Sequence, residues 1–435
     1  MPYTAAWEFL QGLQKHGVKL GLEPIQTLLG QLGNPQDRYR TIHIGGTNGK
    51  GSTAAMAAAM LQAAGYRVGL YTSPHLIDFR ERIRINGDPI PDDAVAQLTG
   101  RLRMTLRDTM GQEVLPTFFE FTTALAFQHF AEAGVDVAVI EVGLGGRFDA
   151  TNTVRPMLSV ITNVALDHQD HLGDSVDAIA FEKAGIIKCG VPVVTGRLSA
   201  EAAEVVEQVA ADRGAPIFRL ARDFRAAGDP LAGFHYEGLR RSYYNLSSPL
   251  VGLHQLDNAA CAVAALELTS DLGLPVFEQA IRDGLRATQW EGRLEVVERQ
   301  PTLLLDGAHN PAAAEAVAAY LASYRRAHPA SRVVLIVGMM RDKDRVEFLR
   351  LLLPLADELV LTQASIPRAA SVEELVAALD EKAGAAQAVP DPAEALALAR
   401  RLASSEDLIC VTGSLLLVGE MKALLRGCGL SPIRG

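Results

Sequence analysis

The stretch TIHIGGTNGKGST at residues 41–53 decides the fold. A short apolar strand at 41–44 runs into a glycine-rich turn, and an alanine-rich helical pattern follows through Ala64 and ends at Gly65. A strand, a glycine-rich turn and a helix in this order form a βα unit, in which backbone N–H groups at the helix start point into the turn. The stretch therefore predicts an α/β fold with a phosphate-binding loop.

Residues 45–52, GGTNGKGS, contain the groups that a bound triphosphate needs. Glycines let backbone N–H groups close around phosphate oxygens, Lys50 supplies charge for the β- and γ-phosphates, and Ser52 supplies a hydroxyl for Mg²⁺. The spacing departs from GxxxxGK[ST], because Gly45 lies four residues before Gly49 and a glycine is inserted before Ser52. A glycine-rich turn without a ligand is the alternative, but it leaves Lys50 and Ser52 unexplained.

Further apolar runs alternate with helical patterns along the first two thirds of the chain. The predicted strands are VGLYT at 68–72, VDVAVIEVG at 135–143, LSVITNV at 158–164 and VPVVTG at 191–196. Such alternation predicts a mostly parallel sheet with helices on both faces. The aromatic, turn-rich segment 234–250 predicts a small antiparallel ribbon, and helical stretches follow from His254 and Val276.

A chain of 435 residues is longer than one core usually supports, so two domains are expected. After Trp290 the strand TLLLD begins a new series that continues with VVLIVGMM, ELVLTQA and LICVTGS. The restarted rhythm places the boundary near Glu298 to Pro301, which gives domains of 1–298 and 299–435.

Composition narrows the function classes. A net charge of -10 argues against broad nucleic-acid binding, which needs a basic face. The four cysteines lie far apart and form no CxxC pair, so neither a zinc site nor a disulfide framework is indicated. No export signal or membrane span is visible, and we expect a cytoplasmic protein.

A series of motifs along the chain resembles one enzyme family. In chain order the motifs are GGTNGKGST at 45–53, YTSPHL at 71–76, TFFE at 117–120, EVGLGGRFDATN at 141–152, LDHQDHLG at 166–173, EKAGI at 182–186, HQLDNA at 254–259, WEGRLE at 290–295, DGAHNP at 306–311 and TGSLLLVGE at 412–420. Together they resemble the folylpolyglutamate synthase/dihydrofolate synthase family of the Mur-type ligases, in its bifunctional bacterial form.

The resemblance implies a P-loop ATPase domain with a mostly parallel sheet, followed by a smaller Rossmann-like α/β domain that closes over the nucleotide. It implies an ATP-dependent acid–amino-acid ligase, ADP-forming, that phosphorylates a carboxylate of dihydropteroate or a reduced folate. The amine of L-glutamate then displaces the phosphate. Phosphorylation is chemically reasonable because a carboxylate is a poor acyl donor, so catalysis reduces to positioning and charge neutralisation.

The resemblance also implies roles for individual residues. It places Gly46, Thr47, Asn48, Gly49, Lys50, Gly51, Ser52, Asn258, Arg293, Asp306 and His309 at ATP, with Asn258 near the adenine, Arg293 at the phosphates, and Asp306 and His309 at the ribose and phosphates. It makes Lys50, Lys183, His168 and Arg293 the catalytic set. Asn310 before Pro311 also describes an ordinary helix start, which leaves Asp306 and His309 unexplained.

For the metal, the resemblance implies two Mg²⁺ ions held by Ser52, Ser73, Glu141, His168 and a carbamylated Lys183. Glu141 suits the hard cation best, because Mg²⁺ prefers oxygen ligands, whereas imidazole suits softer ions. His168 has a loop-capping alternative, and Ser73 before Pro74 can cap a turn. Lys183 lies in the helical pattern DAIAFEKAGII, where a solvated lysine is the default interpretation. Carbamylation would need a neutral amine, and therefore a lysine with a lowered pKa.

For the folate, the candidates are Phe119, Arg147, Asp149, Ala150 and Arg82. A carboxylate at Asp149 can accept hydrogen bonds from a pterin ring. The run TFFEFTTALAF is more often the buried face of a helix, so we expect at least one of Phe118 and Phe119 in the core. Arg82 belongs to a basic stretch with Arg80 and Arg84, for which a solvated strand edge is the alternative to contact with an anionic tail.

Two other functions compete. A peptidoglycan-type ligase acting on a UDP-linked sugar would normally carry another domain before the phosphate loop, which here begins by residue 45. A regulatory P-loop ATPase would hydrolyse ATP without regard to glutamate or folate. The sequence leaves open which synthase activities are present, the glutamate-binding residues and a requirement for a monovalent cation such as K⁺; a monomer is the family expectation.

Overall fold

The structure is a computed structural model that describes residues 3–14, 17, 21–109, 116–379, 386–431 and 433. Its larger sheet has eight strands in the order β4-β3-β2-β5-β1-β6-β7-β8. In chain order these are β1 Arg40–Gly45, β2 Val68–Tyr71, β3 Ile83–Ile85, β4 Asp88–Pro89, β5 Val137–Glu141, β6 Leu158–Asn163, β7 Val193–Arg197 and β8 Ile217–Arg219. Strands β2, β5, β1, β6, β7 and β8 are parallel, and β3 and β4 form an antiparallel edge. The mostly parallel sheet predicted from sequence is confirmed.

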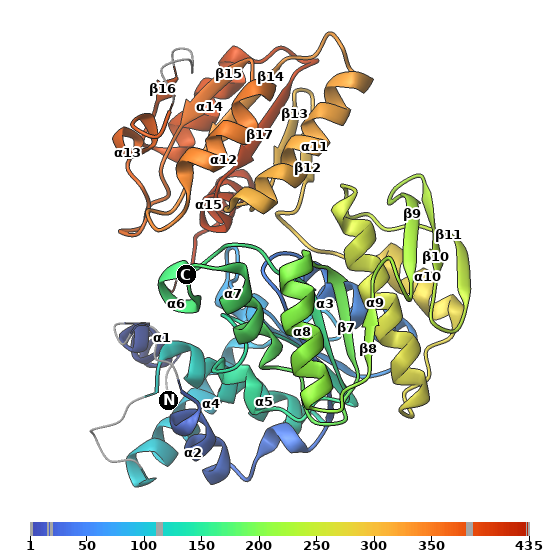
Figure 1. Ribbon diagram of the computed structural model, residues 1–435. Helices are drawn as coiled ribbons and strands as arrows, with labels where there is room; N and C mark the ends of the chain where they lie inside the picture. The colour runs from blue at the N-terminus through green and yellow to red at the C-terminus, as the bar shows by residue number, and fades with distance from the viewer. Residues whose placement is uncertain are drawn as a thin grey trace.

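Helices cover both faces of this sheet (Figure 1). They are α1 Tyr3–Leu13, α2 Glu23–Gln31, α3 Lys50–Ala63, α4 Asp92–Thr109, α5 Phe118–Ala133, α6 Gln169–Leu172, α7 Val176–Ala184, α8 Ala200–Asp212, α9 His254–Asp271 and α10 Glu278–Ala287. On β1, the side chains of Ile42 and Ile44 pack in one core with α3, α9 and α10. Residues on the opposite face of the sheet pack with α1, α2, α4 and α5, or with α7 and α8 nearer the β7 edge.

The predicted ribbon is a three-stranded antiparallel sheet of β9 Arg225–Asp229, β10 Gly233–Glu237 and β11 Ser242–Leu246. The rings of Tyr236 and Tyr243 stack 5.9 Å apart on its inner face. The sequence pattern missed β9, because that strand is short, polar and largely exposed.

The second sheet has six strands in the order β12-β13-β17-β14-β15-β16, and only β12 is antiparallel. Its elements are β12 Glu295–Arg299, β13 Thr302–Leu305, α11 Pro311–Ala327, β14 Val333–Val337, α12 Arg345–Leu352, β15 Glu358–Leu361, α13 Val372–Val376, β16 Gln387–Ala388, α14 Pro392–Leu402, β17 Leu408–Thr412 and α15 Leu415–Arg426. Apolar cores lie on both faces of this sheet. The expected boundary at 298 and 299 falls inside β12, which pairs with β13, so the second sheet begins at Glu295.

The two sheets and their helices lie one above the other, and the last helix α15 lies on the side of the second domain that faces the first (Figure 1). The chain then returns to the first sheet, where Ser431 N–H donates to the carbonyl of Ile77 over 2.8 Å. Ile433 is fully buried there among residues of α1, α2 and α5. Across the described ranges, the helices are too short or too polar to cross a membrane.

Candidate functional site

Two adjoining cavities lie where the two sheets meet. The larger has a volume of about 460 Å³ and the smaller about 330 Å³. Both are lined by residues of both domains, and they share the wall residues Ser73, Pro74, Gly143, Leu144, His168, His309 and Leu415. A group in one cavity can therefore lie next to a group in the other.

The phosphate loop forms the floor of the larger cavity, because the carboxyl ends of parallel strands meet at one edge. In the register of the sheet, Ile44 of β1 lies beside Glu141 of β5, and Gly45 beside Ile161 of β6. Helix α3 begins at Lys50, so it includes the last three residues of the predicted loop 45–52. The helix N-terminus therefore points at the cavity, where it favours an anion.

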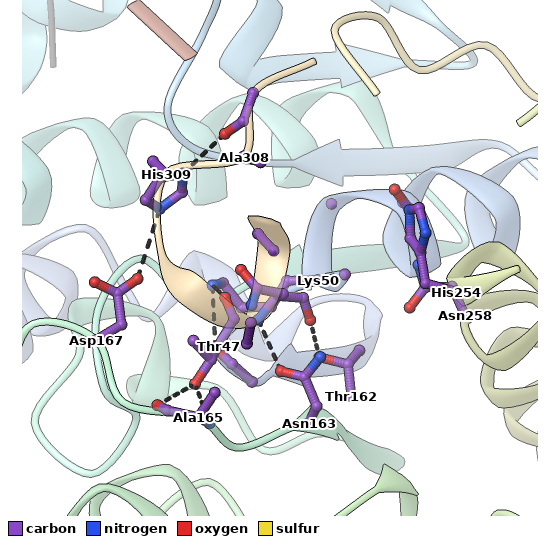
Figure 2. Close-up of a pocket in the computed structure, with 18 of the residues that line it drawn as sticks. Thr47, Lys50, Thr162, Asn163, Ala165, Asp167, His254, Asn258, Ala308 and His309 are labelled. Carbon is purple, nitrogen blue, oxygen red and sulfur yellow. Dashed lines mark hydrogen bonds and ion pairs between the residues drawn. The ribbon is translucent and has the colours of Figure 1, made fainter. Parts of the chain in front are cut away.

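Neighbouring strand ends hold the loop in shape (Figure 2). Asn163 accepts from the N–H of Asn48 over 2.8 Å with its side chain and from the N–H of Thr47 over 3.0 Å with its carbonyl. Thr162 donates its hydroxyl to the carbonyl of Asn48 over 2.6 Å. Gly46 has a φ of 139°, and a Cβ there would lie 2.0 Å from the Thr162 hydroxyl oxygen. Glycine is therefore required at position 46.

Two lysines converge on this loop. The Lys50 ammonium donates to the carbonyls of Gly46 and Thr47 over 3.1 and 3.0 Å, and Lys183 donates to the carbonyl of Gly46 over 3.0 Å. Burial, followed by the charge of Lys50, lowers the pKa of Lys183 to about 7. Burial also lowers the pKa of Lys50, against the charges of Glu141 and Asp167. The default interpretation of Lys183 as a solvated lysine is wrong, because the residue is only 4% exposed.

Glu141 ends β5 beside this pair and lines the larger cavity with Ser52 and Ser73. Its carboxylate accepts from the N–H of Ser73 over 3.1 Å. Burial raises the pKa of Glu141, while the charge of Lys50 opposes the rise. One buried carboxylate and two hydroxyls around a phosphate loop fit Mg²⁺, which usually binds through one or two carboxylates and substrate phosphates. Among the described residues no three His, Cys, Asp or Glu side chains cluster as a complete metal site.

His168 lies at the junction of the two cavities and adopts a left-handed backbone conformation, with φ 52°. Its Nε2 is 3.5 Å from the ammonium of Lys343 in the second domain. Burial lowers the pKa of His168 to about 4, against the charge of Asp167. The imidazole is therefore neutral near pH 7 and has a lone pair available for a cation.

The second domain contributes Arg293, Asp306 and His309 to the larger cavity. Asp306 follows β13, and its carboxylate accepts from the N–H groups of Leu294 and Ala308, each over 2.8 Å. Burial lowers the pKa of the Arg293 guanidinium, and the charges of Asp306 and Glu141 oppose that shift. The second domain thus brings Arg293 to the phosphate loop. The alternative of an ordinary surface arginine does not describe this position.

Asn310 starts α11 as predicted, accepting from the N–H of Ala313 over 2.9 Å. It also forms a reciprocal amide pair with Asn48 of the phosphate loop, at 3.1 and 3.0 Å, and donates to Asp167 over 2.9 Å. The helix start and the interdomain contact are therefore made by the same side chain.

Asp167 is a further interdomain residue, which sequence reasoning missed. Its carboxylate lies 2.5 Å from the Lys343 ammonium. It also lies 3.5 Å from Nε2 of His309 (Figure 2). Burial raises the pKa of Asp167, but the hydrogen bond and charge of His309, with the charges of His168 and Lys343, hold the pKa well below its ordinary value. The acidic residue in LDHQDH and the lysine in RDKD were the available signals, but nothing local joins them.

At the far end of the larger cavity, Asn258 of α9 faces the loop. Its amide nitrogen donates to Gln255 over 2.9 Å, and a Cβ on Gly49 would lie 2.3 Å from its Oδ1. Gln255 in turn lies 3.4 Å from the hydroxyl of Ser52. The structure thus connects the predicted adenine-binding and metal-binding residues through Gln255, which the sequence analysis did not single out.

Four of the five predicted folate residues line the smaller cavity: Arg82, Phe119, Asp149 and Ala150. Arg147 lines neither cavity, so its contact with a folate stays a prediction. Its guanidinium lies 2.6 Å from Glu182 and over the rings of Phe148 and Phe181, at 4.4 and 5.0 Å. These partners hold the guanidinium outside both cavities.

The three arginines of the basic stretch after TSPHL have different surroundings in the structure. Arg82 is buried, and its Nε donates to Nδ1 of His75 over 2.8 Å. Arg80 instead pairs with Asp78 and Asp92 at 2.6 and 3.0 Å, while Arg84 donates to a backbone carbonyl. Neither Arg80 nor Arg84 lines the two cavities, so contact with an anionic tail remains a prediction for Arg82 alone.

Most of the acceptor capacity of Asp149 is used inside its own loop. The carboxylate accepts from the N–H of Leu144 over 2.8 Å, from the N–H of Thr151 over 3.0 Å and from the Thr151 hydroxyl. Burial raises its pKa, and these hydrogen bonds oppose the rise. Asp149 therefore shapes the cavity wall, and a direct hydrogen bond to a pterin stays a prediction.

Comparisons with known proteins agree with this architecture. Residues 44–266 match the Mur ligase middle domain, and residues 292–415 match the Mur ligase glutamate ligase domain. The chain is 36% identical over 434 residues to the dihydrofolate synthase/folylpolyglutamate synthase of Bacillus subtilis, covering 98% of this chain and 99% of that protein.

Solved structures with similar sequences have the same fold. One is Escherichia coli FolC in complex with DHPP and ADP, with 32% identity, 98% of each chain covered and a TM-score of 0.88. Another is the folylpolyglutamate synthase of Mycobacterium tuberculosis complexed with ADP, with 34% identity, 97% of this chain and 99% of that one covered, and a TM-score of 0.89. The chain therefore belongs to the dihydrofolate synthase/folylpolyglutamate synthase family of the Mur ligases.

Proposed function

We propose that the protein uses ATP to join L-glutamate to dihydropteroate, forming dihydrofolate, and to the γ-glutamyl tail of reduced folates. The observation that carries the proposal is the shared wall of the two cavities. It allows a carboxylate held in the smaller cavity to reach a triphosphate held over Lys50 in the larger one. The family membership supports the same chemistry.

In the first step, an oxygen of the acceptor carboxylate attacks the γ-phosphorus of ATP, and ADP leaves with the bridging electron pair. Lys50 and Arg293, which approach the phosphate loop from opposite domains, neutralise the charge on the transferred group. The surrounding walls hold the two reactants in line. In the second step, the neutral amine of glutamate attacks the acyl carbon, and phosphate leaves with the former carboxylate oxygen.

Mg²⁺ fits the donor set of Ser52, Ser73, Glu141 and His168, and a carbamylated Lys183 would provide oxygen donors for a second ion. When bound, the ions would neutralise charge on the phosphates and orient them. The chain's own part is to place a carboxylate, two hydroxyls and a neutral imidazole on the phosphate side of the shared wall. No residue pattern in the described structure identifies a site for K⁺, which stays a prediction.

We further propose that glutamate binds against the second-domain wall of the smaller cavity. That wall contains Lys343, Arg368 and Ser414, whose charges and hydroxyl suit two carboxylates. Lys343 already pairs with Asp167 in the structure, so its ammonium lies at the junction of the cavities. An amino acid held there can direct its amine towards the shared wall.

The two domains have different roles in the proposed reaction. We propose that the first domain binds ATP and the folate, and that the second, from residue 292 onwards, supplies the glutamate side and completes the nucleotide site. Action as a monomer stays a prediction. All four cysteines are free, in keeping with a reducing cytoplasm.

The direct test is ADP release with Mg²⁺, ATP and L-glutamate, in the presence of 7,8-dihydropteroate, a reduced folate monoglutamate or no acceptor, with products identified by mass. Turnover with both acceptors, each gaining the mass of one glutamate residue, supports the bifunctional enzyme. Turnover with one acceptor alone restricts the proposal to that activity. ADP release that ignores the acceptor favours a regulatory ATPase. If neither folate acceptor is used, a further reaction with a UDP-linked sugar acid tests for a peptidoglycan-type ligase.

A further inference from the structure

A buried histidine lies behind the smaller cavity without lining it. His43 is on the central strand β1, two residues before the phosphate loop, and is completely buried. Its Nε2 is 2.9 Å from the hydroxyl of Thr151, and its Nδ1 has no hydrogen-bond partner among the described residues. Burying a polar imidazole costs free energy of folding, and the hydrogen bond at Nε2 is the interaction here that offsets this cost.

The direction of the hydrogen bonds follows from the number of protons. The Thr151 hydroxyl has one proton, and its other partner, the carboxylate of Asp149, can only accept. Thr151 therefore donates to Asp149 and accepts from His43, which fixes the proton of the neutral imidazole on Nε2. Burial, followed by the charge of Lys188, lowers the pKa of His43 to about 3, so the ring stays neutral.

This series of hydrogen bonds, from His43 through Thr151 to Asp149, ends at a wall of the smaller cavity. Asp149 holds loop 143–151 together, because it accepts from Leu144 at one end of the loop and from Thr151 at the other. Gly143, Leu144, Phe148, Asp149 and Ala150 of this loop all line the cavity. The orientation of one carboxylate thus determines the shape of a wall made by five residues.

We propose that His43 is a positioning residue for the acceptor substrate: through Thr151 it orients Asp149 and so sets the loop that forms one wall of the smaller cavity. The inference rests on the proposed function, which places the folate there. It differs from a packing role because it requires a donor at Nε2.

The test compares His43→Leu, which removes the donor, with His43→Gln, whose amide can still donate to Thr151. Thr41→Val is a matched control, since Thr41 is buried on the same face of β1 and its hydroxyl also has no partner among the described residues. Steady-state constants are measured for dihydropteroate and ATP, with direct binding of dihydropteroate by calorimetry.

We expect His43→Leu to raise the KM and Kd for dihydropteroate at least about tenfold while the KM for ATP changes less than about twofold. His43→Gln and Thr41→Val should stay within about threefold of wild type. Equal constants in His43→Leu and wild type, or His43→Gln as impaired as His43→Leu, would overturn the inference.

Two further results separate a folding defect and a failure of the proposed function. If His43→Leu does not fold, Thr151→Val against Thr151→Ser repeats the comparison one bond further along, and a Val variant with unchanged dihydropteroate binding overturns the inference. If wild-type protein neither binds nor uses dihydropteroate, the proposed function fails first, and this inference falls with it.

Discussion

Replacing Lys183 by methionine should make the protein more stable and inactive. The ordinary lysine pKa of 10.5 falls to about 7 at this site. The shift of roughly 3.5 units corresponds to about 5 kcal/mol against the charged form, of which about 4 kcal/mol is felt at pH 7. Methionine fills a similar volume without charge but loses the hydrogen bond to Gly46, worth about 1 kcal/mol. A net gain of about 3 kcal/mol remains.

The gain should shrink as pH rises. A lysine with a depressed folded-state pKa penalises folding fully below the folded value near 7, and the penalty disappears as pH approaches the unfolded value near 10.5. At pH 9 the penalty is about 2 kcal/mol, so Lys183→Met should gain only about 1 kcal/mol. For a domain of this size, these gains raise Tm by roughly 6 °C at pH 7 and roughly 2 °C at pH 9.

Differential scanning calorimetry in CO₂-free buffer measures both values, since a carbamylated lysine would change the reference protein. In parallel, wild-type activity should fall when CO₂ is removed, whereas the variant stays inactive with or without it. A variant no more stable than wild type at pH 7, or a gain that is the same at pH 9, refutes the argument from burial. Full activity in Lys183→Met refutes the role of the lysine in catalysis.

Four other substitutions test three separate parts of the site. Lys50→Ala should abolish ATP turnover with an unchanged circular dichroism spectrum; turnover at the wild-type rate would remove the phosphate-loop interpretation. Asp167→Asn and Lys343→Met should each cost about 2 kcal/mol of interdomain contact and raise the radius of gyration measured by small-angle scattering, with the double variant no worse than the singles. Additive effects would contradict direct coupling. Arg147→Ala should leave the KM for dihydropteroate within about threefold, because Arg147 lines neither cavity; a tenfold rise would restore it as a folate residue.

Local patterns allowed the prediction of features that depend on neighbouring residues in the chain. The phosphate loop, the helix that follows it and the start of α11 after Asn310 are set by residues within one turn, so spacing and residue type reveal them. The central strands β1, β2, β5, β6, β7, β13, β14, β15 and β17 were visible because they are short apolar runs between turns. The sequence analysis missed β3, β4, β8, β12 and β16, which are very short or more polar.

Features made by distant parts of the chain could not be predicted in this way. Asp167 and Lys343 are 176 residues apart and meet only because the two sheets face each other. The burial of Lys183 depends on how α7 packs against the loop. The helical pattern around it gave no sign of this packing, so a solvated lysine was the default interpretation. The position of Arg147 outside both cavities was not visible either, because it depends on Glu182, on another element, which pairs with its guanidinium.

The central claim is that amide formation proceeds through an acyl phosphate, and oxygen transfer tests it most directly. Dihydropteroate labelled with ¹⁸O in its carboxylate is turned over with ATP and glutamate, and the released phosphate is analysed by mass. The proposed chemistry predicts one ¹⁸O atom in the phosphate for each amide formed, because the carboxylate oxygen leaves with the phosphoryl group. Unlabelled phosphate accompanying labelled amide product, or phosphate released without any amide, would contradict it.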